Sequence, residues 1–101
     1  MLDLELMKKI AAALMTQSEL TVSDQTLRVQ RTGTNRLRRV EFVMNGGQYA
    51  AIEQNPYKPS RWGTLARQGH QVVQFLDLNT RHYIAVAIDG EIKQYGKLGK
   101  K

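Results

Sequence analysis

Few side chains of this sequence could carry out acid–base catalysis. The chain has two histidines, His70 and His82. Asp77 would stand opposite His82 if a turn at residues 79 and 80 joins their strands, and a carboxylate there favours the charged imidazole. Glu53 could form a polar corner, but nucleophilic catalysis needs a nucleophile beside a base, and none stands at a predictable distance. We therefore predict a non-catalytic protein, with an enzyme that uses Glu53 and His70 as the less favoured alternative.

Metal and cofactor chemistry have even less support. Two histidines 12 positions apart lack the third protein ligand that a zinc or iron site needs. The sequence has no cysteine, which excludes thiolate sites and disulfides and is typical of a reducing compartment. Residues 96–100 read GKLGK, but a phosphate-binding loop has a longer glycine spacing and opens a helix. We predict no metal, no cofactor and a flexible basic tail over 96–101.

A cluster of arginines is the strongest chemical signal in the chain. The formal net charge is +6, and residues 28–39 contain five arginines and no acid. Basic groups gathered on one hairpin can neutralise several phosphates and gain affinity through counterion release. The sequence therefore predicts an anion- or nucleic-acid-binding site made of Arg28, Arg31, Arg36, Arg38 and Arg39.

Aromatic residues could add stacking surfaces to this charge. Nucleic-acid-binding domains often stack bases on rings that a β-sheet displays, and the rings available are Tyr49, Tyr57, Trp62, Tyr83 and Tyr95. Alternatively, rings such as Tyr49 and Trp62 fill the core, and the basic hairpin is a solvated rim or docks an acidic protein. A second candidate partner surface consists of Tyr57, Lys58, Arg61, Trp62 and Arg67. The sequence leaves the choice between a protein partner and nucleic acid open.

The elements that would position these residues begin with an amphipathic helix. Apolar residues recur at three- and four-residue spacing, which predicts a helix over about residues 3–16.

The uncharged stretch 10–18 is far shorter than the ~20 residues that a membrane-spanning helix needs. Asp3 and Glu5 stand where a signal peptide needs positive charge. We predict a cytoplasmic protein without a membrane span.

From residue 27 the apolar period changes to two, which predicts β-strands. A turn at 33–36 places Leu27 opposite Phe42 and Arg31 opposite Arg38. Like charges across a ladder are unfavourable, so this end of the hairpin should be wet or hold an anion.

A second turn follows at Asn45 and Gly46, which tolerate the positive φ angles of a type I′ hairpin. It predicts a third strand over 47–53 on the same apolar face. This register also brings Arg38 opposite Glu53, where the two side chains could form an ion pair at the margin of the sheet.

Both prolines fall within residues 54–59 and break the strand pattern. Ser60 can then cap a short helix that stops at Gly69. A glycine inside a helix lowers its stability by up to about 1 kcal/mol relative to alanine. Gly63 therefore indicates a close backbone approach.

The last third of the chain reads as strands. Residues 70–77 and 82–88 are rich in β-branched and aromatic side chains and form a predicted hairpin. Its turn would place Val73 opposite Val86. A further turn predicts a last strand over about 91–95.

Together these elements predict an α+β fold in a single domain over 1–101, because 101 residues leave room for one core. The predicted architecture is an antiparallel sheet of five to six strands, arranged as two β-meanders. The N-terminal helix and the short middle helix pack on this sheet.

Residues 53–70 contain the segments EQNP, KPSRWG and ARQGH. With the strands that follow, they resemble small uncharacterised proteins of a cyanobacterial type. The resemblance implies no activity, cofactor or site residue, and it favours an accessory or assembly role. We therefore interpret the chain as a non-catalytic basic binding module for an anionic partner or a protein complex, with an RNA- or DNA-binding protein that uses the hairpin 28–39 as the alternative.

Overall fold

The order of helices and strands follows the predicted order, with one additional hairpin near the N-terminus. The computed structural model describes residues 3–94. The predicted tail 96–101 and Tyr95 lie outside the described residues. The helices are α1 (Leu4–Leu14) and α2 (Arg61–Arg67). The strands are β1 (Glu19–Val22), β2 (Gln25–Arg28), β3 (Gln30–Thr32), β4 (Leu37–Met44), β5 (Gly47–Glu53), β6 (Val72–Asp77), β7 (His82–Ile88) and β8 (Glu91–Gln94).

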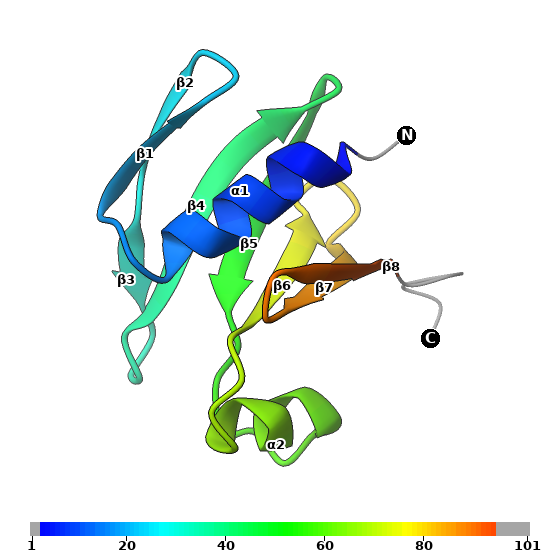
Figure 1. Ribbon diagram of the computed structural model, residues 1–101. Coiled ribbons are helices and arrows are strands. Elements are labelled where there is room, and N and C mark those ends of the chain that lie inside the picture. The colour runs from blue at the N-terminus through cyan, green and yellow to red at the C-terminus, as the bar shows by residue number, and fades with distance from the viewer. Residues whose placement is uncertain (1–2, 95–101) are drawn as a thin grey trace.

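Strands β3 to β8 form one antiparallel sheet in sequence order. The two predicted meanders join because β5 pairs with β6 across the connection that contains α2. Strands β1 and β2 form a separate hairpin beside the sheet (Figure 1). The predicted α+β fold, with an antiparallel sheet and two helices, is confirmed. Within residues 3–94, neither helix has the length and apolar character needed to cross a membrane.

Helix α1 packs across one face of the sheet (Figure 1). It begins after Asp3, whose carboxylate accepts a hydrogen bond from the backbone N–H of Leu6 at 3.1 Å and so caps the first turn. Its apolar stripe meets alternate side chains of β4, β5 and β6, because successive residues of a strand point to opposite faces. Phe42 and Phe75 meet edge to face at the centre, with ring centroids 6.1 Å apart.

The strand predicted to start at residue 27 is divided in two, which corrects the sequence interpretation. Strand β2 pairs with β1, and only β3 pairs with β4. Leu27 therefore lies opposite Leu20 rather than Phe42. The β1–β2 turn is made by Ser23 and Asp24, with φ angles of 44° and 63°. This turn lacks the glycine that usually marks a two-residue hairpin, so its sequence signal is weak.

The β3–β4–β5 region otherwise has the predicted register. Asn45 and Gly46 make the turn, with φ angles of 50° and 81°. Arg31 stands opposite Arg38. Glu53 contacts the backbone of Arg38 and not, as predicted, its side chain. The Oε1 atom of Glu53 accepts a hydrogen bond from the backbone N–H of Arg38 at 2.9 Å. The carboxylate thus ends the ladder and forms no ion pair with the guanidinium group.

The β6–β7 hairpin contains a β-bulge that the sequence does not reveal. Pairs beside the turn follow the prediction, but the register shifts within β6 and leaves Ile84 as the extra residue. Val73 consequently lies opposite Ala87 rather than Val86. A shift of one residue exchanges the two faces of a strand. Ala87 therefore joins the core under α1, and Val86 lies on the opposite face.

Helix α2 lies at the end of β5 and β6 (Figure 1). Ser60 caps it, because its Oγ accepts a hydrogen bond from the backbone N–H of Gly63 at 3.1 Å. The predicted close approach at Gly63 is confirmed: a β-carbon there would collide with the carbonyl oxygen of Lys58. Glycine at this position allows the proline-containing loop to lie against the helix.

Candidate functional site

Arg31 and Arg38 face each other across β3 and β4. Arg31 Nη1 donates a hydrogen bond to the carbonyl oxygen of Arg36 at 3.0 Å. Among residues 3–94 the ion pairs are Arg39 with Glu41 and His70 with Asp89, so the guanidinium groups of the two opposed arginines form no ion pair there. The two side chains line a hollow, which we call the arginine hollow, together with Thr16, Gln17, Ser18 and Val29.

The surroundings of the arginine hollow are polar. Its wall is the segment that directly follows α1, whose C-cap is Met15. The C-terminal end of a helix carries partial negative charge, which offsets part of the repulsion between the two arginines. Ser18 adds a hydroxyl at the wall. Two guanidinium groups with a hydroxyl are chemically suited to a phosphate or a carboxylate.

The remaining arginines of the predicted cluster lie apart from this pair, with Arg28 at the end of β2 and Arg36 and Arg39 on the β3–β4 hairpin. Arg39 neighbours Arg38 in β4, and consecutive strand residues point to opposite faces. Arg39 pairs with Glu41 at 3.0 Å and lines a different hollow with Arg28. Arg36 lies in the turn, with a φ of 51°. The structure therefore surrounds the hairpin with positive charge and does not gather the five arginines on one face.

The second predicted surface has a structural part and an exposed part. Arg67 braces the loop, because its Nη1 donates hydrogen bonds to the carbonyl oxygens of Pro56 at 2.5 Å and Lys58 at 3.0 Å. Tyr57 is 73% exposed. The guanidinium of Arg61 lies 5.0 Å from the ring centroid of Trp62, as in a cation–π contact. Arg67 thus holds the shape of this surface, and its other members face solvent or the hollow described next.

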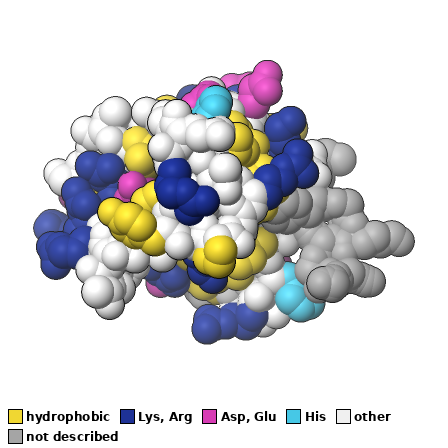
Figure 2. All heavy atoms as spheres, turned by 90° about the horizontal axis from the view of Figure 1, so that it is seen from below, with side chains coloured by type: hydrophobic (Ala, Val, Ile, Leu, Met, Phe, Trp, Pro, Cys, Tyr) yellow, Lys and Arg dark blue, Asp and Glu magenta, His cyan; other side chains and the backbone are white. Residues whose placement is uncertain are grey.

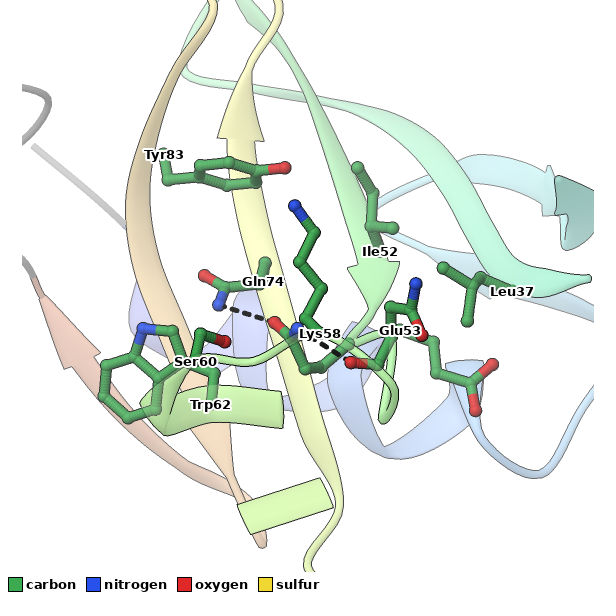
Figure 3. A pocket seen from close by; sticks show the side chains of 10 residues that line it. Leu37, Ile52, Glu53, Lys58, Ser60, Trp62, Gln74 and Tyr83 are labelled. Carbon is green, nitrogen blue, oxygen red and sulfur yellow. Dashed lines mark hydrogen bonds between the residues drawn. The ribbon is translucent and has the colours of Figure 1, made fainter. Parts of the chain in front are cut away.

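A hollow of about 330 Å³ opens at the end of the sheet where α2 lies (Figure 3). We call it the outer hollow, since its floor belongs to the sheet face opposite α1. Ile52, Gln74 and Tyr83 contribute to the floor, and Lys58 and Trp62 to the wall formed by the loop and α2. Lys58, Trp62 and Tyr83 were candidate binding residues from the sequence, whereas Ile52 and Gln74 were not.

The polar groups of the outer hollow are held in place by one another. Gln74 is only 8% exposed, and its Nε2 donates a hydrogen bond to Oε1 of Gln54 at 2.9 Å. Gln54 in turn donates to the carbonyl oxygen of Asn55 at 3.1 Å. The side chain of Lys58 extends across the hollow between Tyr83 and Ile52 (Figure 3). The result is a concave surface with fixed amides, an aromatic ring, the Lys58 cation and the Glu53 carboxylate.

His70 and Asp89 form an exposed contact between the α2–β6 connection and the β7–β8 turn. His70 Nδ1 lies 2.7 Å from Asp89 Oδ2. This hydrogen bond, together with one from the backbone N–H of Gln71, lowers the pKa of Asp89 below its ordinary value. The pair links the α2–β6 connection to the β7–β8 turn, and it lines neither of the two hollows.

Asp77 and His82 stand opposite each other, as predicted. The Asp77 carboxylate, however, accepts hydrogen bonds from the backbone N–H groups of Asn79 at 2.9 Å and Thr80 at 3.2 Å. It therefore stabilises the turn. Residues 3–94 contain no group of three or more histidine, aspartate or glutamate side chains that could hold a metal ion.

The end of the molecule that carries α2 is rich in positive charge. Figure 2 looks onto this end and shows Lys and Arg side chains around exposed apolar groups, while most of the visible acidic surface lies at one rim. Leu37 lines the outer hollow, and its neighbour Arg38 lines the arginine hollow. Because consecutive strand residues point to opposite faces, the two hollows lie on opposite faces of the sheet at the start of β4.

One signal in the sequence could have pointed to the outer hollow. Gln74 is a single polar residue inside the apolar run 72–76. A buried polar side chain needs a hydrogen-bond partner, so such a residue indicates a polar contact on the second face of the strand. The partner, Gln54, is 20 positions away and comes into contact only through the pairing of β5 with β6.

Searches of family models, curated proteins and solved structures find no match to this chain. The resemblance of residues 53–70 to cyanobacterial proteins stays a sequence-based interpretation.

Proposed function

We propose that this chain is a non-catalytic binding domain for an anionic polymer, and that single-stranded nucleic acid is its partner. The observation that carries this proposal is the opposed pair Arg31 and Arg38, whose guanidinium groups form no ion pair with a carboxylate among residues 3–94. Like charges directly opposite each other destabilise a ladder. A phosphate bound between the two guanidinium groups would replace this repulsion with two favourable contacts.

The charge around the arginine hollow supports a polymer rather than a single small anion. Arg36, Lys58 and Arg61 are exposed, and the β3–β4 turn that holds Arg36 points toward the same end of the molecule as α2 (Figure 1). Each additional phosphate that such side chains neutralise releases counterions and raises the affinity. A chain of phosphates can engage several of these groups at once.

The aromatic residues favour single-stranded nucleic acid over an acidic protein or a duplex. Tyr83 is 45% exposed, and Trp62, which is partly exposed, lines the same outer hollow. Unpaired bases can stack on such rings, whereas a duplex hides the faces of its bases. An acidic protein segment would use the charge and leave the rings without a matching group. A domain of this kind fits the accessory role expected from the sequence.

The test measures the affinity of the nuclease-treated protein for single-stranded RNA, for duplex DNA and for poly-glutamate. Each ligand is measured at about 50 and 200 mM salt, because a contact to several phosphates weakens steeply over this range. We expect the tightest binding to the single strand, with a strong fall at the higher salt. Binding to poly-glutamate alone would contradict the proposal and favour an acidic protein partner.

A matched pair of variants locates the contact. The double variant Arg31→Gln/Arg38→Gln removes two charges from the arginine hollow, and Lys8→Gln/Lys9→Gln removes two charges from exposed positions of α1. We expect at least a tenfold loss of affinity, about 1.4 kcal/mol, from the first variant and a much smaller loss from the second. Equal losses would mean that net charge alone attracts the ligand.

A further inference from the structure

The outer hollow contains chemistry that phosphate binding does not need. A phosphate contact requires cations and N–H or O–H donors. This hollow instead combines a buried glutamine, two aromatic side chains and one lysine with the carboxylate of Glu53, which accepts a hydrogen bond from the backbone N–H of Arg38. Such a combination is suited to a flat ligand with polar edges.

The aromatic groups are placed to receive a flat ring. In Figure 3 the Tyr83 and Trp62 side chains lie along one side of the outer hollow, with Gln74 between them. Tyr83 comes from β7 and keeps 45% of its surface exposed, although it lies on the sheet. A base stacked on an exposed ring gains contact area without displacing protein groups.

The amides are placed to recognise the edge of a ring. A glutamine side chain carries both donor and acceptor groups, and amide pairs of this kind match the edges of nucleobases. The Gln74 amide is held by Gln54 at 2.9 Å, so its orientation is set before a ligand arrives. A volume of about 330 Å³ lies at the lower end of the range for small-molecule pockets. This size is appropriate to one base and too small for an extended peptide.

We propose that the outer hollow binds one unpaired nucleobase. The base stacks on Tyr83 beside Trp62, its edge contacts the Gln74 amide, and Lys58 contacts the phosphate attached to the same nucleotide. This inference rests on the proposed function, because the base belongs to the strand whose backbone contacts the arginine hollow. The consecutive residues Leu37 and Arg38 border the two hollows from opposite faces of β4, so a strand that passes around the start of β4 would reach both.

The experiment uses the single tryptophan of the chain, Trp62, as an internal probe. Tryptophan fluorescence and affinity are measured with a short single-stranded RNA and with an abasic oligomer of equal length and charge. Two matched variants follow: Tyr83→Leu removes a ring from the outer hollow, and Tyr57→Leu removes an exposed ring that does not line it. Both replaced residues are well exposed, so both variants should fold.

We expect the RNA to quench Trp62 and to bind about tenfold more tightly than the abasic oligomer. Tyr83→Leu should remove most of that difference, and Tyr57→Leu should preserve it. If RNA and abasic oligomer bind equally with the same salt dependence, the base pocket is refuted while the proposed function stands. If neither oligomer binds at low salt, both proposals fail.

Discussion

Strand β4 has an apolar half and a basic half, and the two are built differently. Val40, Phe42 and Met44 are 1%, 3% and 2% exposed and pack under α1. Arg38 and Arg39 at the start of the strand are only partly buried, and their partner strand β3 is three residues long. One half of the strand therefore contributes to the core, and the other positions charge at its margin.

The apolar half of β4 should determine the stability of the protein, and the basic half should determine its binding of a ligand. Burial of apolar side chains is the main favourable term in folding, so the apolar half should determine the free energy of unfolding. The basic half lies at the margin of the core and contains a like-charge pair. Substitutions there should change ligand binding and alter stability only slightly.

The largest expected effect is that of Phe42→Ala. Phe42 is 3% exposed and contacts the rings of Phe75 and Tyr49. Its truncation should lower the free energy of unfolding by about 3–5 kcal/mol, as measured by urea denaturation. The neighbouring control Val43→Ala, at a residue 47% exposed, should change stability by about 0.5 kcal/mol or less. Similar losses in the two variants would contradict the division of β4.

Gly63→Ala should have the next largest effect. Helix propensity alone would stabilise α2 by about 1 kcal/mol. The new β-carbon, however, would meet the backbone carbonyl of Lys58, and overpacking of this kind lowers stability by about 1–3 kcal/mol. We expect net destabilisation in thermal unfolding and a displaced Lys58 at the outer hollow. A more stable variant would show that the loop moves freely.

Arg31→Gln/Arg38→Gln should produce a smaller effect of opposite sign. Removing the opposed charges relieves a cross-strand repulsion, which should raise the free energy of unfolding by about 0.2–1 kcal/mol in low salt. Chemical denaturation at low and high salt measures this gain, which screening should reduce. Lower stability instead would indicate that the arginines mainly support the C-terminal end of α1.

The smallest expected effect concerns Asp89. Its pKa in the folded protein is lowered, chiefly by the hydrogen bond with His70, from an ordinary value of 3.8. The folded state therefore binds fewer protons there, so the contribution to stability is complete above that ordinary value and is lost as pH falls through the folded pKa. Asp89→Asn should reduce stability slightly at neutral pH and have no effect in strong acid, as measured by thermal unfolding. A difference that grows toward low pH would contradict this sign.

Local signals account for the parts of the fold that were predicted correctly. Asn45 and Gly46 define a turn type by themselves, and that turn determines the pairing of β4 with β5. Ser60 and Gly63 identified the start of α2 and its contact with the loop for the same reason. The charge of the hairpin was also readable, because charge is a property of the sequence itself.

Features that depend on distant partners were not predictable. The bulge at Ile84 moves Ala87 under α1, and no glycine or proline in residues 82–88 marks its position in the sequence. The β1–β2 turn lacks glycine, so only its packing reveals it. In the outer hollow, the pairing of β5 with β6 brings Gln54 and Gln74 into contact. Neither partner identifies the other in the sequence.

The salt dependence of RNA binding tests the central claim most directly. The logarithm of the affinity is measured against the logarithm of salt concentration for the unaltered protein, for Arg31→Gln/Arg38→Gln and for Lys8→Gln/Lys9→Gln. If Arg31 and Arg38 hold a phosphate, the slope should become shallower by about 1 for each phosphate that the first variant no longer neutralises, and it should stay unchanged in the second. An unchanged slope in the first variant would contradict the account.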